Sequence, residues 1–355
     1  MSVLKEIQKQ LRKPSHIALV TSDINRRYVT GFKSSAGVAV ITHDEGILLI
    51  DSRYYEKASE QVEGFHVILM QDLYKQLERI FEEYGADLVS IENKTMTVSE
   101  LNSYTEHFSD IEFDSSEWLS DAIGRMRIIK TEEEIEKIIA AQKIAEAAFS
   151  KLLSKMTAGM TEKQVATALD FYMMDLGADD LSFDTIAASG KNSACPHAVP
   201  TSKPLEDGDF LTLDFGAVVD GYHSDMTRTV CIGKPTDEMK EVYNAVWGAN
   251  TDALKAVRAG ITCKLLDSVA RSTLEAWSLE KYFGHGLGHG VGLEIHEAPT
   301  VSPRSDTTLH EGMIITIEPG VYLPHKFGVR IEDMCVVTEN GCRNLTNTPK
   351  SLIYI

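Results

Sequence analysis

Residues 205–216 read LEDGDFLTLDFG, and residues 309–320 repeat the pattern without a gap as LHEGMIITIEPG. Each copy carries an acid at the same place, Asp214 in the first and Glu318 in the second. Turn residues follow each copy, and a further acid comes after the turn. The repeat therefore predicts two similar β-hairpins, each with a carboxylate on both of its strands.

The second acids of the two hairpins are Asp225, in HSDMTRT, and Glu332, in VRIED. The turn signal VDG lies midway between Asp214 and Asp225, so a tight hairpin would set these aspartates nearly opposite each other. Their Cβ atoms would then be about 4.5 to 5.5 Å apart. Glu318 and Glu332 are centred in the same way on His325, and we expect the same geometry there.

Four acids beside one another in a largely apolar sheet have raised pKa values or need a counter-charge. Two divalent metal ions would supply four positive charges. The donors are mainly oxygen with an imidazole nearby, which favours Mn²⁺, with Co²⁺ or Zn²⁺ as alternatives. Two ions about 3.5 to 4 Å apart share a hydroxide and polarise a carbonyl oxygen, so the predicted reaction is hydrolysis, most simply of an amide.

The repeat extends beyond the hairpins. AGMTEK at residues 158–163 and AGITCK at 259–264 each read as a helix stop at Gly followed by a Thr N-cap. Between that signal and its acids, each copy also has a histidine, His197 in NSACPHAVP and His296 in GLEIHEAP. Chance similarity is disfavoured because acids, glycines, caps and histidines recur in order. We therefore expect two halves, at 130–235 and 236–355, related by a pseudo-twofold with the acids at their junction.

The segment GHGLGHGVGLEIHE, residues 284–297, has glycine at every second position of its first part. This period predicts an extended strand whose glycine face lets backbone or ligand approach closely. His285 and His289, four residues apart, are therefore not a helical zinc pair. Strict alternation would put His289 and His296 on opposite faces, so one of them must reach the site after a bend.

Composition narrows the class of protein. The chain has 355 residues, 43% of them hydrophobic and 25% charged, which is typical of a globular protein with room for two domains. Its formal net charge of −18 argues against nucleic acid or an anionic membrane as a partner. The first residues lack the apolar core of a secretory signal, and no run approaches a membrane span. Five cysteines without a CxxC pair favour reduced thiols in the cytoplasm.

Residues 1 to 120 alternate β-rich runs with amphipathic helices, which predicts an α/β domain. The runs are HIALVTS, GVAVITH, GILLID, FHVILM and DLVSIEN. No GxGxxG or Walker motif supports nucleotide binding. Thr131 with Glu134 forms a capping box that opens a long helix after this domain. We predict an α+β protein with domains at residues 1–122 and 123–355.

The motifs LTLDFG, HSDMTRT, GHGVGLEIHE, TIEPG and VRIED resemble the five metal-ligand motifs of the pita-bread metallopeptidases, family M24. This family includes methionine aminopeptidase, aminopeptidase P and prolidase. The resemblance implies a pita-bread catalytic domain of two pseudo-twofold halves with a curved antiparallel sheet, after a smaller creatinase-like α/β domain. PHAVP around His197 and the presence of the N-terminal domain are similar to the Xaa-Pro branch.

Carried over motif by motif, the resemblance implies these metal ligands: Asp214, Asp225, His289, Glu318 and Glu332. Asp225 and Glu332 would bridge the two ions, whose shared hydroxide would attack the Xaa-Pro carbonyl. Glu318 would also move the proton from the attacking water to the leaving amine.

Histidines of the repeat complete the expected site. His197 and His296 would bind the scissile carbonyl and stabilise its oxyanion. His285 is a further candidate, either for contact with the substrate or for support of a metal ligand. A lone histidine is usually structural, and three others are interpreted as surface or turn residues: His223, His310 and His325.

The length of the substrate stays open. Many prolidases have an arginine shortly after the EIHE-type motif, which meets the carboxylate of a C-terminal proline, whereas APT follows here at residues 298–300. This favours an Xaa-Pro aminopeptidase, acting on proline-containing peptides, over a strict Xaa-Pro dipeptidase. Arg304, Lys326 or Arg330 would be the substitutes, and Arg330 is the substrate-binding candidate among them. The remaining alternatives are an inactive peptide-binding module and a metal-free amidinohydrolase. Relatives are often dimers, so we expect a homodimer.

Overall fold

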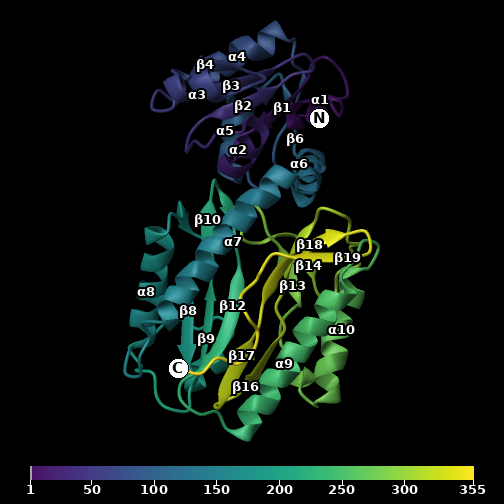
Figure 1. The fold of residues 1–355 in the computed structure, drawn as a ribbon. Coiled ribbons are helices and arrows are strands. Elements are labelled where there is room, and N and C mark those ends of the chain that lie inside the picture. The colour runs from purple at the N-terminus through teal and green to yellow at the C-terminus, as the bar shows by residue number, and fades with distance from the viewer. Residues whose placement is uncertain (1) are drawn as a thin grey trace. The chain divides into compact units, whose positions relative to one another are not determined.

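The computed structural model describes residues 2–355, and they form two compact units, one ending at Arg127 and the other covering Ile128–Ile355 (Figure 1). The predicted boundary at residues 122 and 123 lies inside helix α6, Trp118–Ile128. The division into domains 1–122 and 123–355 stays a prediction. None of the helices within residues 2–355 combines the length and apolar character that a membrane crossing needs.

The first unit is built on a six-stranded mixed sheet of order β4-β3-β2-β1-β5-β6. All five predicted β-rich runs are strands, and only the last strand of the sheet was not predicted. The central strand β1 is buried along its whole length, which explains its continuous apolar run. The strands are β1 His16–Val20, β2 Val38–Ile41, β3 Gly46–Ile50, β4 Phe65–Leu69, β5 Leu88–Ser90 and β6 Glu112–Asp114.

Helices cover this sheet, each burying one apolar stripe. In α4, for example, Leu77, Ile80 and Phe81 follow the helical period and are buried. The helices that precede α6 are α1 Val3–Gln8, α2 Asp23–Thr30, α3 Tyr55–Gln61, α4 Leu73–Glu83 and α5 Val98–His107. The first unit is therefore the α/β layer that the sequence predicts.

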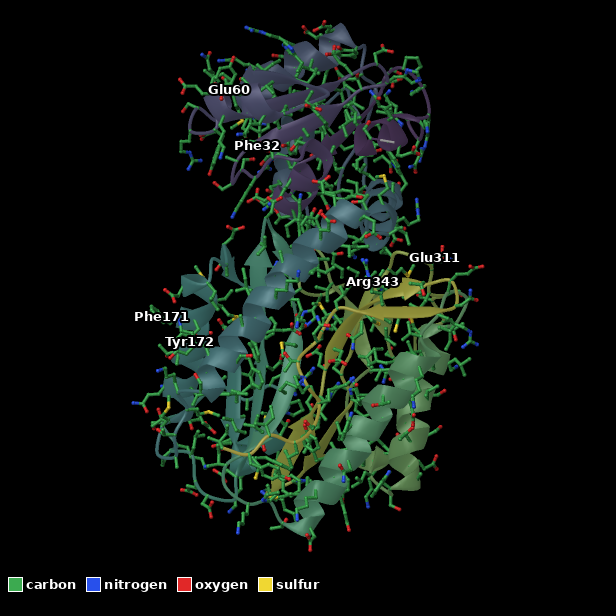
Figure 2. All side chains as sticks on the ribbon, in the orientation of Figure 1. Phe32, Glu60, Phe171, Tyr172, Glu311 and Arg343 are labelled. Atoms are coloured by element: carbon green, nitrogen blue, oxygen red, sulfur yellow. The ribbon has the colours of Figure 1, made fainter. Side chains whose placement is uncertain are left out.

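The second unit repeats one order of elements twice, two helices and then strands. Its helices are α7 Glu132–Leu153, α8 Glu162–Asp175, α9 Asp237–Ala256 and α10 Cys263–Ala276, with two short 3₁₀ turns, η1 Gly190–Ala194 and η2 Glu280–Tyr282. Each of the four helices has a threonine N-cap whose side chain accepts a backbone N–H. In α8, Val165, Leu169 and Met173 face the core, whereas Phe171 lies on the outer surface (Figure 2).

All strand pairs of the second unit within named strands are antiparallel. The first half contains β7 Asp180–Leu181, β8 Ile186–Ser189, β9 Phe210–Phe215, β10 Ala217–Val219, β11 Tyr222–His223 and β12 Met226–Cys231. The second half contains β13 Gly288–Gly290, β14 Glu297–Val301, β15 Ile314–Ile317, β16 Gly320–Leu323, β17 Phe327–Arg330, β18 Asp333–Thr338 and β19 Gly341–Asn344. The strands of the two halves run side by side between α8 on one flank and α9 and α10 on the other (Figure 1).

The second acid hairpin has the predicted register. Ile317 pairs with Asp333 where β15 meets β18, and the same register continues through β16 and β17. Glu318 and Glu332 lie between these two ladders and therefore oppose each other. The prediction of a hairpin centred on His325 is confirmed, and this residue has the positive φ of a turn, 64°.

The first acid hairpin has a different register from the predicted one. Asp214 pairs with Thr227, so Asp225 lies diagonally across from Asp214 and not directly opposite it. The cause is a two-residue turn at Asp220 and Gly221, whose φ values are 46° and 74°, as in the primed hairpin turns. Because diagonal neighbours share a face of the ladder, the two aspartates still face the same side.

The two halves meet where β12 runs beside the segment between β17 and β18. The N–H of Glu332 donates to the carbonyl of Thr227 at 3.1 Å, and Arg330 exchanges bonds with the Thr229 hydroxyl through its N–H at 3.2 Å and its carbonyl at 2.9 Å. The acids of both hairpins therefore converge at the junction of the halves, as the repeat predicts.

Candidate metal centre and substrate pocket

One pocket of about 910 Å³ in the second unit collects every residue predicted for the site. Its lining includes the five predicted metal ligands, Asp214, Asp225, His289, Glu318 and Glu332, and the four substrate-side candidates, His197, His285, His296 and Arg330. Asp214 lies in β9, Asp225 directly precedes β12, and His197 lies on the segment after η1. The others come from the glycine-rich segment and the second hairpin. The pocket lies where the two halves join.

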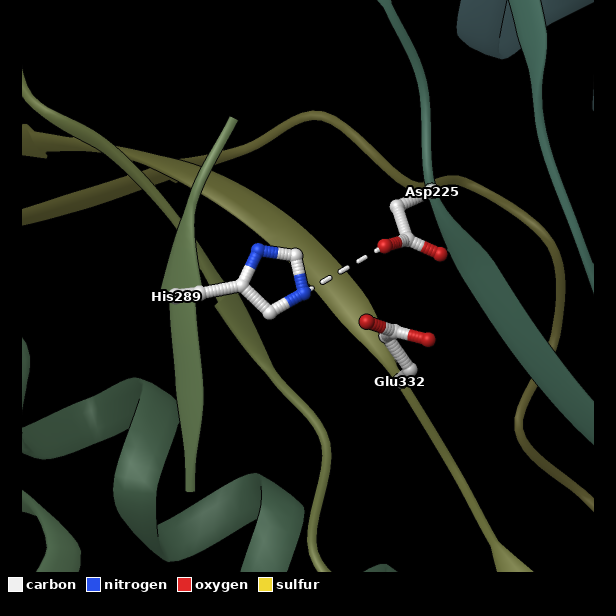
Figure 3. A group of neighbouring side chains, drawn as sticks. All are labelled: Asp225, His289 and Glu332. Carbon is white, nitrogen blue, oxygen red and sulfur yellow. Dashed lines mark ion pairs between the residues drawn. The ribbon is translucent and has the colours of Figure 1, made fainter. Parts of the chain in front are cut away.

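Three of the predicted ligands form a compact group that is able to hold one ion. The ligand atoms of Asp225, His289 and Glu332 all lie within 4.8 Å of one another. Figure 3 shows the three side chains reaching toward one point from three separate segments of the chain. His289 Nε2 is 3.5 Å from Asp225 Oδ2 and also 3.5 Å from Glu318 Oε1.

The orientation of His289 is set by its surroundings. Its Nδ1 is 3.0 Å from the carbonyl oxygen of Gly290, which accepts the Nδ1–H. The lone pair of Nε2 therefore faces the carboxylates, which is the tautomer that a metal ligand needs. The backbone N–H of His289 donates to the Thr316 hydroxyl at 3.1 Å, and that hydroxyl donates to Glu318 Oε1 at 3.3 Å.

Two carboxylate oxygens of the site are buried and accept no hydrogen bond from residues 2–355. They are Asp214 Oδ1 and Glu332 Oε1. The other oxygen of each group is occupied, Asp214 Oδ2 by Arg330 Nη2 at 2.6 Å and Glu332 Oε2 by the Thr227 hydroxyl at 2.7 Å. Because a buried acceptor without a partner is costly, these oxygens indicate ligand positions for cations.

The pKa values of the acids support the same interpretation. Burial, followed by the charges of neighbouring acids, raises the pKa of Asp225 and of Glu332 well above the usual range. Burial also raises the pKa of Glu318 to about 8, despite the Arg330 charge, which lowers it. Burial lowers the pKa of His289 to about 4, so this imidazole is neutral at pH 7. Oxygen donors plus one neutral imidazole fit hard or borderline divalent cations.

We expect the metal-free protein to lose thermal stability as pH rises from about 7.5 to 8.5. Glu318 titrates near 8 when folded and near its usual 4.3 when unfolded, so the native state holds more protons in this window and its stability falls. Histidines whose folded pKa is depressed act with the opposite sign until their unfolded forms have lost the proton, roughly one pH unit above 6.5, so the window starts at about 7.5. Melting temperatures of chelator-treated protein at several pH values measure the effect. Saturating Mn²⁺ should remove it, and a flat or rising profile without metal would contradict it.

Within the glycine-rich segment, only Gly288–Gly290 in β13 and Glu297 at the start of β14 are strand. The ladder to β14 shifts register after His289, and residues 292–296 form a bend. This bend brings His296 to the same side as His289, with ring centroids 4.4 Å apart. The expectation that one of these histidines reaches the site after a bend is confirmed.

His197 and His285 lie on other walls of the pocket. His197 is exposed, on the segment that follows η1. His285 is half-buried and its Nδ1–H donates to Gly286 O at 2.8 Å. Burial, followed by the Arg330 charge, lowers the pKa of His285 to about 4, so it is neutral at pH 7.

Tyr322 is a member of the site that sequence analysis missed. Its hydroxyl accepts from Arg330 Nη1 at 2.8 Å and donates to His285 Nε2 at 3.0 Å, because Nδ1 of that histidine already carries the proton. Arg330 in turn donates to Asp214, so one chain of hydrogen bonds links a ligand candidate to the pocket wall. Only the position of Tyr322 opposite Gly328 in the second hairpin signals this role in the sequence.

Three other histidines fall outside the pocket lining. His310 is exposed and His325 occupies the turn of the second hairpin, as predicted. His223 is half-buried in β11, where its Nδ1 lies 2.9 Å from the Ser182 hydroxyl, so its interpretation as a surface residue is wrong. The pairing of β11 with β10, in which His223 lies opposite Val218, explains why this side chain is half-buried.

Known proteins resemble the chain along its length. The model of "Metallopeptidase family M24" matches residues 136–339, and that of "Creatinase/Prolidase N-terminal domain" matches residues 4–129. A Pyrococcus furiosus protein named Xaa-Pro dipeptidase is 39% identical over 94% of each chain. Two solved structures are each 38% identical to the present chain. The Xaa-Pro dipeptidase from Bacillus anthracis has a TM-score of 0.95 over 99% of both chains, and the X-Pro aminopeptidase from Thermotoga maritima has 0.91 over 96% of this chain and 97% of that one.

Proposed function

The chain belongs to metallopeptidase family M24, and we propose that it is an Xaa-Pro aminopeptidase, which removes the N-terminal residue from peptides with proline second. Relatives named Xaa-Pro dipeptidase and X-Pro aminopeptidase span its whole length, so it is a metal-dependent Xaa-Pro peptidase of one type or the other. The observation that supports catalysis is the convergence of the complete set of predicted ligands in one pocket.

The residues proposed to hold two divalent ions are Asp214, Asp225, His289, Glu318 and Glu332. Mn²⁺ is the preferred ion, with Co²⁺ or Zn²⁺ as alternatives. When bound, the ions would lower the pKa of a water and polarise the substrate carbonyl. The unpartnered oxygens of Asp214 and Glu332 and the inward Nε2 of His289 support this ligand set.

Side chains around the proposed metal site are assigned the other catalytic roles: proton transfer, stabilisation of the oxyanion and orientation of the substrate. We propose that Glu318, held by the Thr316 hydroxyl, carries the proton from water to the leaving amine. His197 and His296 would donate hydrogen bonds to the scissile carbonyl oxygen as it gains negative charge. His285 and Arg330 would orient the substrate from the wall that Tyr322 supports.

Charge in the pocket favours peptides longer than a dipeptide. Among the described residues that line the pocket, Arg330 is the only lysine or arginine. It already donates to Thr227, Tyr322, Asp214 and the carbonyl of Pro196. Arg304 and Lys326 do not line the pocket, and Lys326 pairs with Glu238 at 2.6 Å. The carboxylate of a dipeptide would therefore find no free lysine or arginine among the lining residues that the structure describes.

A comparison of peptide lengths tests the proposed activity. Under saturating Mn²⁺, we expect kcat/KM for Xaa-Pro-Yaa-Zaa to exceed that for Xaa-Pro by at least about tenfold, because the dipeptide carboxylate is left unpaired. Release of the N-terminal residue is measured by chromatography. Xaa-Ala-Yaa-Zaa is the control for proline specificity and should release little product. A preference for the dipeptide would overturn the aminopeptidase assignment.

The second candidate is a strict Xaa-Pro dipeptidase, since several relatives are named Xaa-Pro dipeptidase. The same peptide series decides between the two. An inactive peptide-binding module would release no residue in the presence of metal, and metal-free amidinohydrolase chemistry would survive chelation. The expected cytoplasmic location and the expected homodimer stay predictions.

A further inference from the structure

We infer that Glu162, which does not line the pocket, is a positioning residue that fixes His197 in the pocket wall. The inference rests on the proposed function, because it takes from it the contact between His197 and the scissile carbonyl. Glu162 is the first residue of α8 and is fully buried. A carboxylate buried this completely needs a full set of donors, and the identity of those donors shows what it holds in place.

The donors to Glu162 come from both ends of the segment that carries His197. Oε1 accepts the N–H of Ser189 at 2.6 Å and its hydroxyl at 2.9 Å. Oε2 accepts the N–H of Thr201 at 2.9 Å and its hydroxyl at 2.6 Å. The side-chain amide nitrogen of Asn192 donates to both oxygens, at 3.0 Å from Oε1 and 3.1 Å from Oε2. One carboxylate thus joins the end of β8 to the residues that follow His197.

The middle of the same segment is tied to the other half of the unit. The Ser193 hydroxyl accepts the N–H of Gly328 at 2.9 Å, and the carbonyl of Pro196 accepts from Arg330 at 3.2 Å. His197 follows directly, and its own side chain is exposed to the pocket. The backbone position of His197 is therefore set by anchors at the ends and in the middle of the segment, and Glu162 supplies both end anchors.

The duplicated half shows that the backbone around Glu162 does not need the carboxylate. In the first half, the N–H of Glu162 donates to Lys203 O at 3.0 Å and that of Lys163 to Thr201 O at 3.0 Å. The second half has the same two bonds after its own N-cap, at 2.8 Å from Cys263 and 2.8 Å from Lys264. A buried cysteine stands there in place of the glutamate.

The glutamate is thus present in only one of the two halves, although both halves carry a histidine on an exposed segment. In the other half, His296 is placed by the bend before β14 and by packing against His289. The electrostatics agree with an ionised anchor. Burial raises the pKa of Glu162, but hydrogen bonds from Thr201 and Ser189 more than offset it, and its pKa lies below the usual value.

A double-mutant cycle between Glu162 and His197 tests the inference. Glu162→Gln keeps the shape of the side chain but turns one acceptor into a donor that faces N–H and O–H groups. We expect it to lower kcat/KM on Xaa-Pro-Yaa-Zaa by about 10- to 100-fold, the usual effect of a displaced catalytic group. In the His197→Ala protein, Glu162→Gln should lower kcat/KM by less than about twofold, because the imidazole that Glu162 positions is absent. Mn²⁺ binding, measured by calorimetry, should not change.

Glu92→Gln is the matched control. Glu92 is equally buried in the first unit and accepts from Thr21, Ser22 and Asn25 through the same kinds of donor, backbone N–H, hydroxyl and amide. Its replacement should lower the melting temperature comparably and leave kcat/KM within about twofold. If Glu162→Gln does not fold, the exposed Thr201 replaces it in the cycle: Thr201→Val removes one bond to Glu162, and Thr201→Ser keeps it.

The outcomes separate this inference from the proposed function. An equal loss of kcat/KM in the wild-type and His197→Ala backgrounds would mean that Glu162 acts through general stability, and would overturn the inference alone. A His197→Ala protein with unchanged kcat/KM would overturn the role of His197 in the proposed function, and the inference with it.

Discussion

Replacing Glu332 by glutamine is expected to lower kcat/KM on Xaa-Pro peptides by at least about 1,000-fold and to weaken Mn²⁺ binding strongly. Glu332 offers one buried oxygen that accepts no hydrogen bond from residues 2–355, while the other is held by Thr227. Glutamine removes the negative charge and can place an NH₂ group where a cation would bind. Glu332 also belongs to the compact group with Asp225 and His289, so its replacement disturbs the ion position that these three residues share.

Metal content and peptide release measured on the same sample check this prediction. Glu311→Gln is the control, because this glutamate lies on the surface of the same unit (Figure 2). It should bind Mn²⁺ and release product as the wild type does. Full activity of the Glu332→Gln protein, with its metal content intact, would contradict the ligand assignment.

Replacing His296 by alanine is expected to lower kcat by about 100- to 1,000-fold with a smaller change in KM, as for the loss of one oxyanion donor. The ring of His296 packs edge-on against His289 and lines the pocket, so it reaches the region where the carbonyl oxygen would develop charge. Because it is not one of the proposed ligands, Mn²⁺ binding should remain within about threefold of the wild type.

Steady-state kinetics together with calorimetric Mn²⁺ titration separate these effects. His310→Ala is the matched control, since His310 is an exposed histidine outside the pocket lining. Loss of metal in the His296→Ala protein would make His296 a ligand or a support of His289. An unchanged kcat would remove it from the chemistry.

The sequence predicts the acid hairpins well because the repeat supplies two independent copies of one pattern. The second register follows from a turn centred on His325, which symmetrical spacing reveals. The register of the first hairpin does not follow from the spacing of its acids. Asp220 and Gly221 form a two-residue turn, and as a result Asp214 pairs with Thr227. Asp-Gly is a sequence signal of a two-residue hairpin turn, so a turn centred between Asp220 and Gly221 would have given the observed register.

Residues that act through others were harder to predict. Tyr322 reads as one apolar residue of a strand, and only its contacts with Arg330 and His285 give it a role. Glu162 reads as a first-turn acid of α8, which the helix dipole alone would explain. Apart from Arg330, which is 8 residues from Tyr322, their partners are distant in the sequence, so the sequence marks these two residues only weakly. The ligands differ in this respect, because the metal chemistry restricts their residue types.

The direct test of the central claim is anomalous diffraction from crystals of the protein grown with Mn²⁺. The account predicts two manganese peaks in the pocket, bound by side chains from the set Asp214, Asp225, His289, Glu318 and Glu332. It would be contradicted by manganese bound elsewhere, or by a pocket without manganese in crystals of protein that hydrolyses Xaa-Pro peptides in a Mn²⁺-dependent manner.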